Sequence, residues 1–435
     1  MCRVKCALAL WLFMASLYVV AQTNGSNSPY SRFGLGALSD ASQGFNKGMA
    51  GVAMGFRQGN RINVQNPASY SAIDSLSLIF DVGISFQNVN FKSGGSRINA
   101  HNTSLDYING GFRLCKNLGL GFGFVPFSNI GYDYSEGEYL GEHFNSGAEM
   151  TYTNSYEGDG GLHEVFIGLG WKMFADLSIG VNAGYLWGDY SQYITQTFYE
   201  DGSSVSSSDG LRRQILASIS SYKIDFGVQY PIRVTKSDVL TVGGTYTLGH
   251  ALDNPAYYYN FLDDGDTTTV TLEKAFELPS AFGAGLCWEH NDQWRVGVDV
   301  TYQFWGSSKM AQVVDEELVS TSDNYSDRTR VAVGGEWRPD RFGVRYFQRV
   351  FYRIGAAYAT PYYKVDGLDG PREYTVTAGF GLPVTKKTDS RSYINVSFQW
   401  VKSKPSSSSL ITENYLRLCV GLTFNERWFM KWKIQ

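Results

Sequence analysis

Apolar and polar residues alternate along most of the chain beyond residue 75. Between Leu177 and Trp187, every odd-numbered position is apolar or aromatic, and most of the positions between them carry serine, glycine or asparagine. The same two-residue period runs through 294–304, 392–401 and 415–424. Because successive side chains of a β-strand point to opposite faces, this period predicts strands with one apolar and one polar face.

The residue types on the two faces indicate which surroundings each face meets. The apolar faces carry aromatic residues towards the strand ends, and the polar faces carry mainly glycine, serine, threonine and asparagine. A soluble β-sandwich also alternates, but its polar face would be richer in lysine and glutamate than a chain with 18% charged residues allows. Lipid outside and a polar lumen inside fit both faces. We therefore expect an all-β fold, a transmembrane antiparallel β-barrel.

About fourteen strands fit the pattern, an even number as in single-chain outer-membrane barrels. Long connections follow the odd-numbered strands, and mostly short ones follow the even-numbered strands, which predicts a barrel with both chain ends in the periplasm. The connection 339–349 is longer than a periplasmic turn should be. The predicted strands are 76–91, 101–115, 117–126, 162–174, 176–199, 211–230, 238–258, 268–288, 293–305, 327–338, 350–361, 373–382, 391–401 and 412–424.

The first residues resemble an export signal. Arg3 and Lys5 precede an apolar stretch, and the small residue Ala21 follows it. This order predicts a signal peptide cleaved after Ala21, with a retained membrane anchor as the alternative. We expect the protein in the Gram-negative outer membrane. The predicted parts of the chain are a signal peptide (1–21), a hatch or plug (22–74), the barrel (75–424) and a periplasmic tail (425–435).

A barrel of about fourteen strands encloses more space than its own side chains can fill. Residues 22–74 are too few for a separate domain and contain too many glycines for a long helix. Their stretch Gly44–Phe56 combines glycine, alanine and methionine, small or adaptable residues that pack closely. We expect this segment to plug the lumen, and a disordered periplasmic leader is the alternative.

Three short motifs resemble the FadL-like transporters of long-chain fatty acids and hydrocarbons. They are Asn66-Pro67-Ala68 before the first strand, Gly119–Phe127 in the third strand, and Leu278-Pro279-Ser280 followed by Trp294–Trp305. The resemblance spans nearly the whole mature chain and departs from the family at Ser128, where glycine is usual, and in the tail. It implies a luminal hatch, a kinked third strand that opens the wall sideways, and passive uptake of hydrophobic small molecules.

Pro126 also has a physical reading of its own. Proline has no N–H group, so within a wall strand it removes a ladder bond and favours a bulge. Such a gap is tolerated in a membrane only where protein or water covers it. A lateral window at this point would let a hydrophobic ligand leave into the membrane. Alternatively, Pro126 ends the third strand and Phe127 is an interface aromatic.

Charged residues on the polar faces have two interpretations. An arginine such as Arg295 or Arg353 could hold a fatty-acid carboxylate by paired hydrogen bonds. Alternatively, these side chains form ion pairs that brace the wall or the plug. The candidate ligand-binding or gating residues are Met49, Met54, Phe56, Asn66, Pro67, Ala68, Pro126, Phe127, Arg295 and Arg353.

Other chemistry is not indicated. The sequence has no G-x-S-x-G or H-E-x-x-H motif, and its cysteines have no metal-ligand spacing. We expect no enzymatic activity, no metal and no cofactor, and a net charge of −4 without a basic stripe argues against nucleic acid. The expected partners are a hydrophobic small molecule and outer-membrane lipid. The alternative function is a non-transporting barrel that docks an unknown protein partner in protein export or surface assembly.

Overall fold

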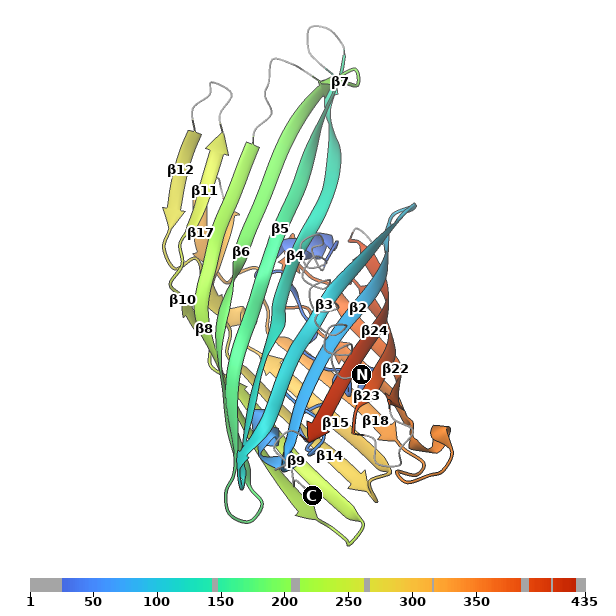
Figure 1. Ribbon diagram of the computed structural model, residues 1–435. Coiled ribbons are helices and arrows are strands. Elements are labelled where there is room, and N and C mark those ends of the chain that lie inside the picture. Colours follow the sequence, from blue (N-terminus) through green and yellow to red (C-terminus); the bar gives the residue numbers. More distant parts are fainter. Residues whose placement is uncertain are drawn as a thin grey trace, which may run out of the picture.

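The computed structural model describes residues 26–142, 148–204, 212–261, 267–314, 317–384, 391–407 and 410–427. Fourteen antiparallel strands form a closed barrel (Figure 1), which confirms the predicted all-β architecture. Each wall strand pairs with the next, and the last pairs with the first from Ser77–Arg427 to Lys92–Thr412. The wall strands are β2 (Ser77–Ser93), β3 (Ser96–Cys115), β4 (Leu118–Glu142), β5 (Glu149–Lys172), β6 (Ser178–Glu200), β8 (Arg212–Arg233), β9 (Asp238–Thr247), β14 (Ala281–His290), β15 (Trp294–Gln303), β18 (Arg328–Trp337), β19 (Phe351–Ala359), β22 (Arg372–Pro383), β23 (Tyr393–Lys404) and β24 (Thr412–Arg427).

Every predicted strand overlaps a wall strand, but some bounds differ. β4 and β5 extend far into the range 127–161, which we expected to be a loop. The ranges predicted for the seventh and eighth strands also overlap four short strands outside the wall, namely β10 (His250–Leu252), β11 (Ala256–Phe261), β12 (Thr267–Leu272) and β13 (Phe276–Leu278). The predicted signal peptide and residues 428–435 of the predicted tail lie outside the described residues, and 425–427 belong to β24.

The extra length has a structural cause. β4, β5, β6 and β8 rise above the rest of the wall, and β11 and β12 continue this tall sheet (Figure 1). A second sheet of β10, β13, β16 (Met310–Val314) and β17 (Glu317–Thr321) packs beside it. Buried side chains including Tyr190, Phe276 and Trp305 form one apolar cluster between them. Alternation therefore continues beyond the membrane because these strands also cover a core.

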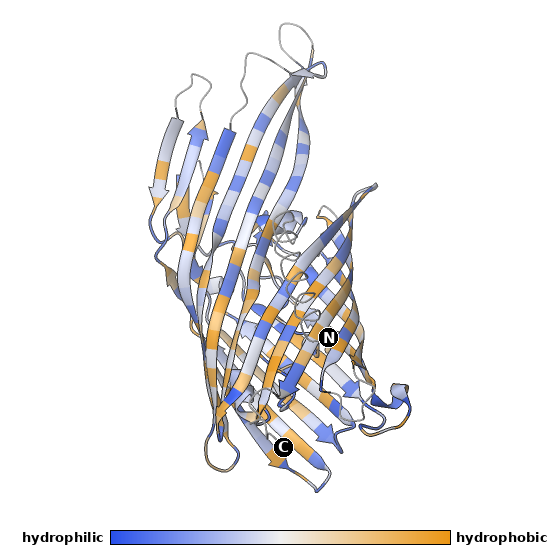
Figure 2. Cartoon of the chain, viewed as in Figure 1, coloured by the Kyte–Doolittle hydropathy of each residue, from blue (hydrophilic) through white to orange (hydrophobic). Residues whose placement is uncertain are grey.

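Within the wall, the alternation separates lipid from lumen. On β15, Val296, Val298 and Val300 are exposed, whereas Arg295 and Asp299 are buried towards the interior. Figure 2 shows the resulting bands of hydrophobic and hydrophilic residues along the strands. Among the described residues, no helix is long and apolar enough to span a membrane.

Residues 26–76, here called the luminal segment, run through the barrel from one end to the other. Ser28 donates a 2.6 Å hydrogen bond to Glu413, at the end of β24 that is far from Ser77. The 3-10 turns η1 (Pro29–Arg32), η2 (Lys47–Met49) and η3 (Pro67–Ala72) follow in order towards the start of β2. The first strand, β2, is predicted to begin at the periplasmic end of the barrel. Residue 26 therefore lies at the other, extracellular end.

The lipid-facing assignment predicts the effect of a new charge. Val298→Arg places a guanidinium on the outer face at mid-wall and should reduce the free energy of unfolding in a bilayer by about 2–4 kcal/mol. Val314→Arg is the control, since Val314 is equally exposed (43% against 44%) but lies on β16 outside the wall. Urea unfolding of the protein in vesicles measures both variants, and equal effects would contradict the assignment.

Candidate functional site

The Asn66-Pro67-Ala68 motif holds the luminal segment at the end of the barrel where β2 begins, which we call the lower end. Asn66 caps η3, because its side-chain oxygen accepts from the Ala68 N–H at 3.2 Å, and Pro67 occupies a first-turn position that needs no N–H donor. The Asn66 amide also donates to Met54 O at 2.9 Å and to Val228 O of β8 at 3.2 Å. Asn66 therefore begins the turn η3 and joins this turn both to Met54 of the segment and to the wall strand β8.

Glycines of the wall allow the backbone of the segment to approach closely. A Cβ placed on Gly243 would lie 1.9 Å from the carbonyl oxygen of Met54, and one on Gly119 would lie 1.9 Å from that of Tyr70. Neither distance is compatible with a side chain. The polar face of the wall is thus shaped to fit the segment's main chain. Other wall glycines in such contact are Gly180, Gly227, Gly334 and Gly355.

Charged wall residues bind the segment's main chain directly. Asp299 Oδ2 accepts from the N–H groups of Ala53 and Met54 at 2.6 and 2.9 Å. Arg330 donates to the Ala50 carbonyl at 2.6 Å. Buried backbone groups need partners, so these two wall residues stabilise a segment that has little secondary structure.

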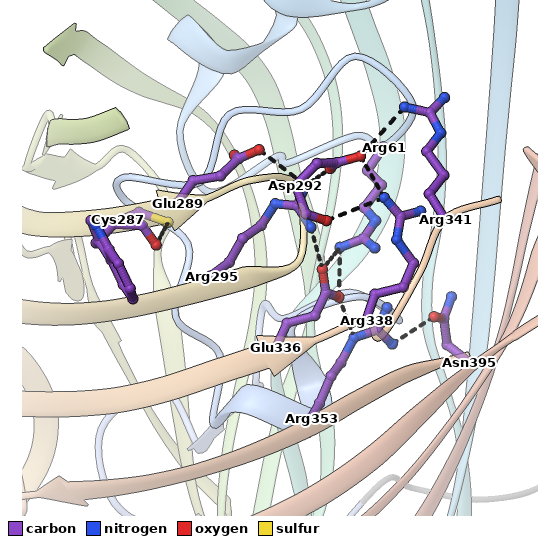
Figure 3. A network of polar contacts seen from close by, with 11 residues as sticks. Arg61, Cys287, Glu289, Asp292, Arg295, Glu336, Arg338, Arg341, Arg353 and Asn395 are labelled. Carbon is purple, nitrogen blue, oxygen red and sulfur yellow. Dashed lines mark hydrogen bonds and ion pairs between the residues drawn. The ribbon is translucent and has the colours of Figure 1, made fainter. Parts of the chain in front are cut away.

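A buried cluster of arginines around Glu336 also fastens the segment at the lower end of the barrel, where β15 and β19 begin and β18 ends (Figure 3). Arg295 and Arg353 lie directly opposite Glu336 on the neighbouring strands. Their nitrogens approach the Glu336 carboxylate to 3.1 and 2.7 Å, and Arg61 of the segment approaches it to 2.8 Å. The side chain of Glu336 is fully buried. One carboxylate therefore joins three wall strands to the segment.

The partners of Arg295 and Arg353 indicate whether these residues could bind a ligand or whether they brace the protein. Besides Glu336, Arg295 pairs with Glu289 and Asp292, and Arg353 donates to Asn395 at 2.7 Å. Neither arginine lines the cavity described below. The structure thus brings both candidates together and gives each a partner within the protein, an arrangement that fits the bracing alternative.

The ladder between β3 and β4 is interrupted part-way up the wall. The two strands pair from Cys115–Leu118 to Ile108–Phe124, and the pairing stops there. Above this point β3 pairs with β2 alone, whereas β4 continues along β5. We call this divergence the seam; it lies between the upper part of β3 and the edge of β4 beyond Val125.

Two bulges explain the seam. On β4, Pro126 and Ser128 pair with consecutive residues of β5, so Phe127 is the extra residue. On β3, Leu105 and Tyr107 pair with consecutive residues of β2, so Asp106 is the extra residue. Bulges bend a strand and end its regular pairing. The strand continues through Pro126, so the bulge that we predicted is present and the alternative strand end is not.

A two-residue strand of the luminal segment bridges the free edge of β4. β1 (Ala37–Leu38) pairs with Asn129 and Ser128, and Ser39 N donates to Phe127 O at 3.0 Å. Phe127 and Leu38 are half-buried and pack against the apolar cluster above the barrel. The segment therefore covers the lower part of the seam.

A cavity of about 430 Å³ lies inside the barrel behind the seam. Its lining has an apolar part that includes Leu38, Met54, Val64, Val125, Phe127 and Phe166. It also has a charged part that includes Lys47, Asp106, Lys223, Asp225, Arg330 and Arg417. The cavity is amphipathic, and Pro126 lies at its border with the seam.

Lys47 links the luminal segment to the bulge of β3. Its amine lies 3.2 Å from Asp106 and 3.9 Å from Asp40. The ion pair with Asp106 ties the segment to β3 at the point where β3 leaves β4.

The remaining candidates lie in two places. Met49 and Phe56 are buried between the segment and the wall, together with Phe45 and Val52. Asn66, Pro67 and Ala68 are buried at the lower end, away from the cavity lining. Only Met54, Pro126 and Phe127 of the ten candidate residues line the cavity.

Several residues that hold the luminal segment or form the seam were not among the candidate residues predicted from the sequence. Lys47, Arg61 and Asp106 act through partners far away in the sequence, so spacing could not reveal them. The inward glycines were interpreted as part of a polar face. A sequence signal was available for the glycines, because they recur at the same parity as the buried polar residues. Within the described ranges, no group of His, Cys, Asp and Glu could hold a metal ion.

Comparison with known proteins identifies the family of this chain. The sequence profile of the BamG family matches residues 3–435. The chain belongs to the BamG family. No curated protein matches the chain.

Solved structures share the fold of this BamG-family barrel. A Pseudomonas aeruginosa FadL homologue has a TM-score of 0.60 at 14% identity, over 88% of this chain and 98% of that one. The P. putida toluene transporter TodX has a TM-score of 0.56 at 15% identity, over 90% and 98%. The Ralstonia pickettii toluene transporter TbuX has a TM-score of 0.55 at 15% identity, over 89% and 98%. The predicted FadL-like fold is confirmed.

The glycine contacts of the BamG-family barrel predict a difference between two adjacent positions. Gly243→Ala should reduce the free energy of unfolding by about 1–3 kcal/mol, because the new Cβ meets the Met54 carbonyl. Gly244→Ala is the control, since its Cβ would point outward with Val228 at 3.3 Å as its nearest neighbour. Urea unfolding measures both, and equal stability of the two variants would contradict the close fit.

The Glu336 cluster predicts a large effect of one neutral substitution. Glu336→Gln removes the carboxylate shared by Arg61, Arg295 and Arg353 and should cost about 3–5 kcal/mol of unfolding free energy, because buried charges lose their partner. Asp366→Asn, in an exposed turn, removes the same charge without a buried partner and should change stability by less than about 0.5 kcal/mol. A loss below 1 kcal/mol for Glu336→Gln would show that the cluster does not brace the barrel.

Proposed function

We propose that this protein works in the Gram-negative outer membrane as a plugged barrel through which a hydrophobic small molecule, such as a long-chain fatty acid or an aromatic hydrocarbon, leaves sideways at the seam. The observation that carries the proposal is the interrupted β3–β4 ladder beside the internal cavity. The similarity in fold to a FadL homologue and to two toluene transporters supports the same kind of activity.

The lining of the cavity fits an amphipathic cargo. The apolar part, with Leu38, Val125 and Phe127, lies next to the seam and suits a hydrocarbon chain. Arg417 lies in the charged part, donates to Gln87 and forms no ion pair with a described residue, so it suits a carboxylate. In this scheme Pro126 and Phe127 line the exit, Met54 contacts the cargo, and Arg295 and Arg353 hold the luminal segment in place.

The gate is the upper part of the luminal segment. β1 is joined to β4 by only two residue pairs, and Lys47 is joined to β3 by an ion pair. The lower part is held by η3, the wall glycines and the Glu336 cluster. Release of β1 would therefore connect the cavity to the membrane while the lower part still blocks the lumen.

A reversible disulfide tests this route. In a Cys115→Ser background, Leu38→Cys with Ser128→Cys fastens β1 to its paired residue on β4. Cells without their own fatty-acid channel should take up labelled oleate through the reduced variant, and uptake should fall at least tenfold on oxidation. The control is Ser85→Cys, which can pair with native Cys419 across β2 and β24, strands that are already joined. Uptake unchanged by oxidation of the β1–β4 pair would exclude the seam as the route.

A second candidate function is a non-transporting barrel that docks a protein partner in export or surface assembly. Two observations favour it: much of the cavity lining is charged, and the luminal segment is tied down by buried ion pairs. Both features suit a permanently closed barrel. Mass spectrometry of the purified protein separates the candidates, because a transporter should retain a fatty acid or hydrocarbon, whereas a docking barrel should retain a stoichiometric protein and no such lipid.

A further inference from the structure

The connection between β18 and β19 is unusual for its end of the barrel. It spans residues 338–350, whereas the four turns at the same end that are fully described have two to five residues. It also has a defined shape: Asp340 N donates to Gln348 O at 2.9 Å, and Tyr346, in the 3-10 turn η5 (Tyr346–Arg349), donates to Pro383 O at 3.2 Å. The connection is longer and more structured than is needed to reverse the chain between two strands, which indicates a further role.

Its apolar side chains face outward. Phe342, Val344 and Phe347 are 63%, 94% and 73% exposed, respectively. Figure 1 shows this orange connection projecting sideways from the lower right rim of the barrel rather than across its mouth. An ordered loop that presents two phenylalanines and a valine to the outside marks a contact surface.

The surface is continuous with the lipid-facing wall. Trp294, Trp337 and Phe380, on strands β15, β18 and β22, are exposed, and Tyr352 on β19 between them is half-buried. The four rings follow one another at 5.5, 5.5 and 5.9 Å. Such aromatic belts lie at the boundary between lipid and water. The Tyr352 hydroxyl donates to Phe347 O at 3.2 Å, so the connection packs against this belt.

The charge of the connection favours one kind of lipid. Residues 338–350 contain four arginines and one aspartate. Arg345 is exposed and has no ion pair with any described residue, and Arg341 is exposed with a 3.4 Å contact to Asp292. Basic side chains beside apolar ones that enter the headgroup region attract anionic phospholipids.

We propose that residues 338–350 are an interfacial anchor that binds anionic phospholipid in the periplasmic leaflet. Phe342, Val344 and Phe347 lie among the upper parts of the acyl chains, and Arg341 and Arg345 contact the phosphate groups. The inference is independent of whether the barrel transports a molecule, because it depends only on the outer surface and the rim.

Fluorescent labelling of the full chain tests the position of the anchor. In a Cys115→Ser background, Val344→Cys carries an environment-sensitive nitrobenzoxadiazole label in phosphatidylcholine vesicles containing 30% phosphatidylglycerol. Lys236→Cys, exposed in the β8–β9 turn at the same end, is the control. The label at 344 should be quenched by nitroxide on lipid chains and protected from aqueous iodide, and the label at 236 should show the reverse.

Lipid selectivity tests the arginines. Nitroxide-labelled phosphatidylglycerol should quench the label at 344 more strongly than nitroxide-labelled phosphatidylcholine, with a local enrichment of up to roughly fivefold per arginine. Arg341→Gln with Arg345→Gln should bring the ratio to one without moving the label out of the membrane. A ratio of one in the protein that keeps both arginines would overturn the proposed lipid specificity.

The opposite position of the label would overturn the proposal altogether. If iodide quenches the label at 344 as strongly as the label at 236, the connection points into water. Its exposed phenylalanines would then form a surface for a protein rather than for lipid.

Discussion

The close contact between the backbone of the luminal segment and the glycines of the wall is the constraint on which the rest of the structure depends. Fourteen strands enclose more space than inward side chains can fill. Here the space is occupied by main chain that approaches the wall closely at positions such as Gly119 and Gly243. The segment has little regular structure, so its N–H and C=O groups need partners from outside. Asp299 and Arg330 of the wall supply several of these partners.

The two ends of the segment are held by different interactions, and this difference supports the proposed gate. At the lower end, backbone packing, the capped turn η3 and a carboxylate shared by three arginines act together. At the upper end, the short strand β1 and hydrogen bonds of Ser31 and Ser39 join the segment to β4, and the Lys47–Asp106 ion pair joins it to β3. A change confined to the upper end could expose the cavity to the membrane without emptying the lumen.

The wall was predictable from sequence because lipid imposes it. A residue such as Val298 must be apolar on the outer face, while Asp299 next to it can be charged, so the strands appear as a two-residue period. The same logic found the bulge at Pro126, whose chemistry is local. The pairing of Asp106 with Lys47, and of Glu336 with Arg61, could not be found in this way because the partners are brought together only by barrel closure. The extension of β4 and β5 into 127–161 was missed because it depends on a separate core above the wall.

The most direct test of the central claim is hydrogen–deuterium exchange of the intact protein in lipid vesicles. Amides of residues 44–72 should exchange as slowly as those of wall strands β14 and β15, since most of these residues are buried and several are bonded to the wall. Residues 31–41 should exchange faster. Exchange of 44–72 at the rate of an unstructured peptide, with the wall still protected, would contradict the account, because the lumen would then not be filled by this segment.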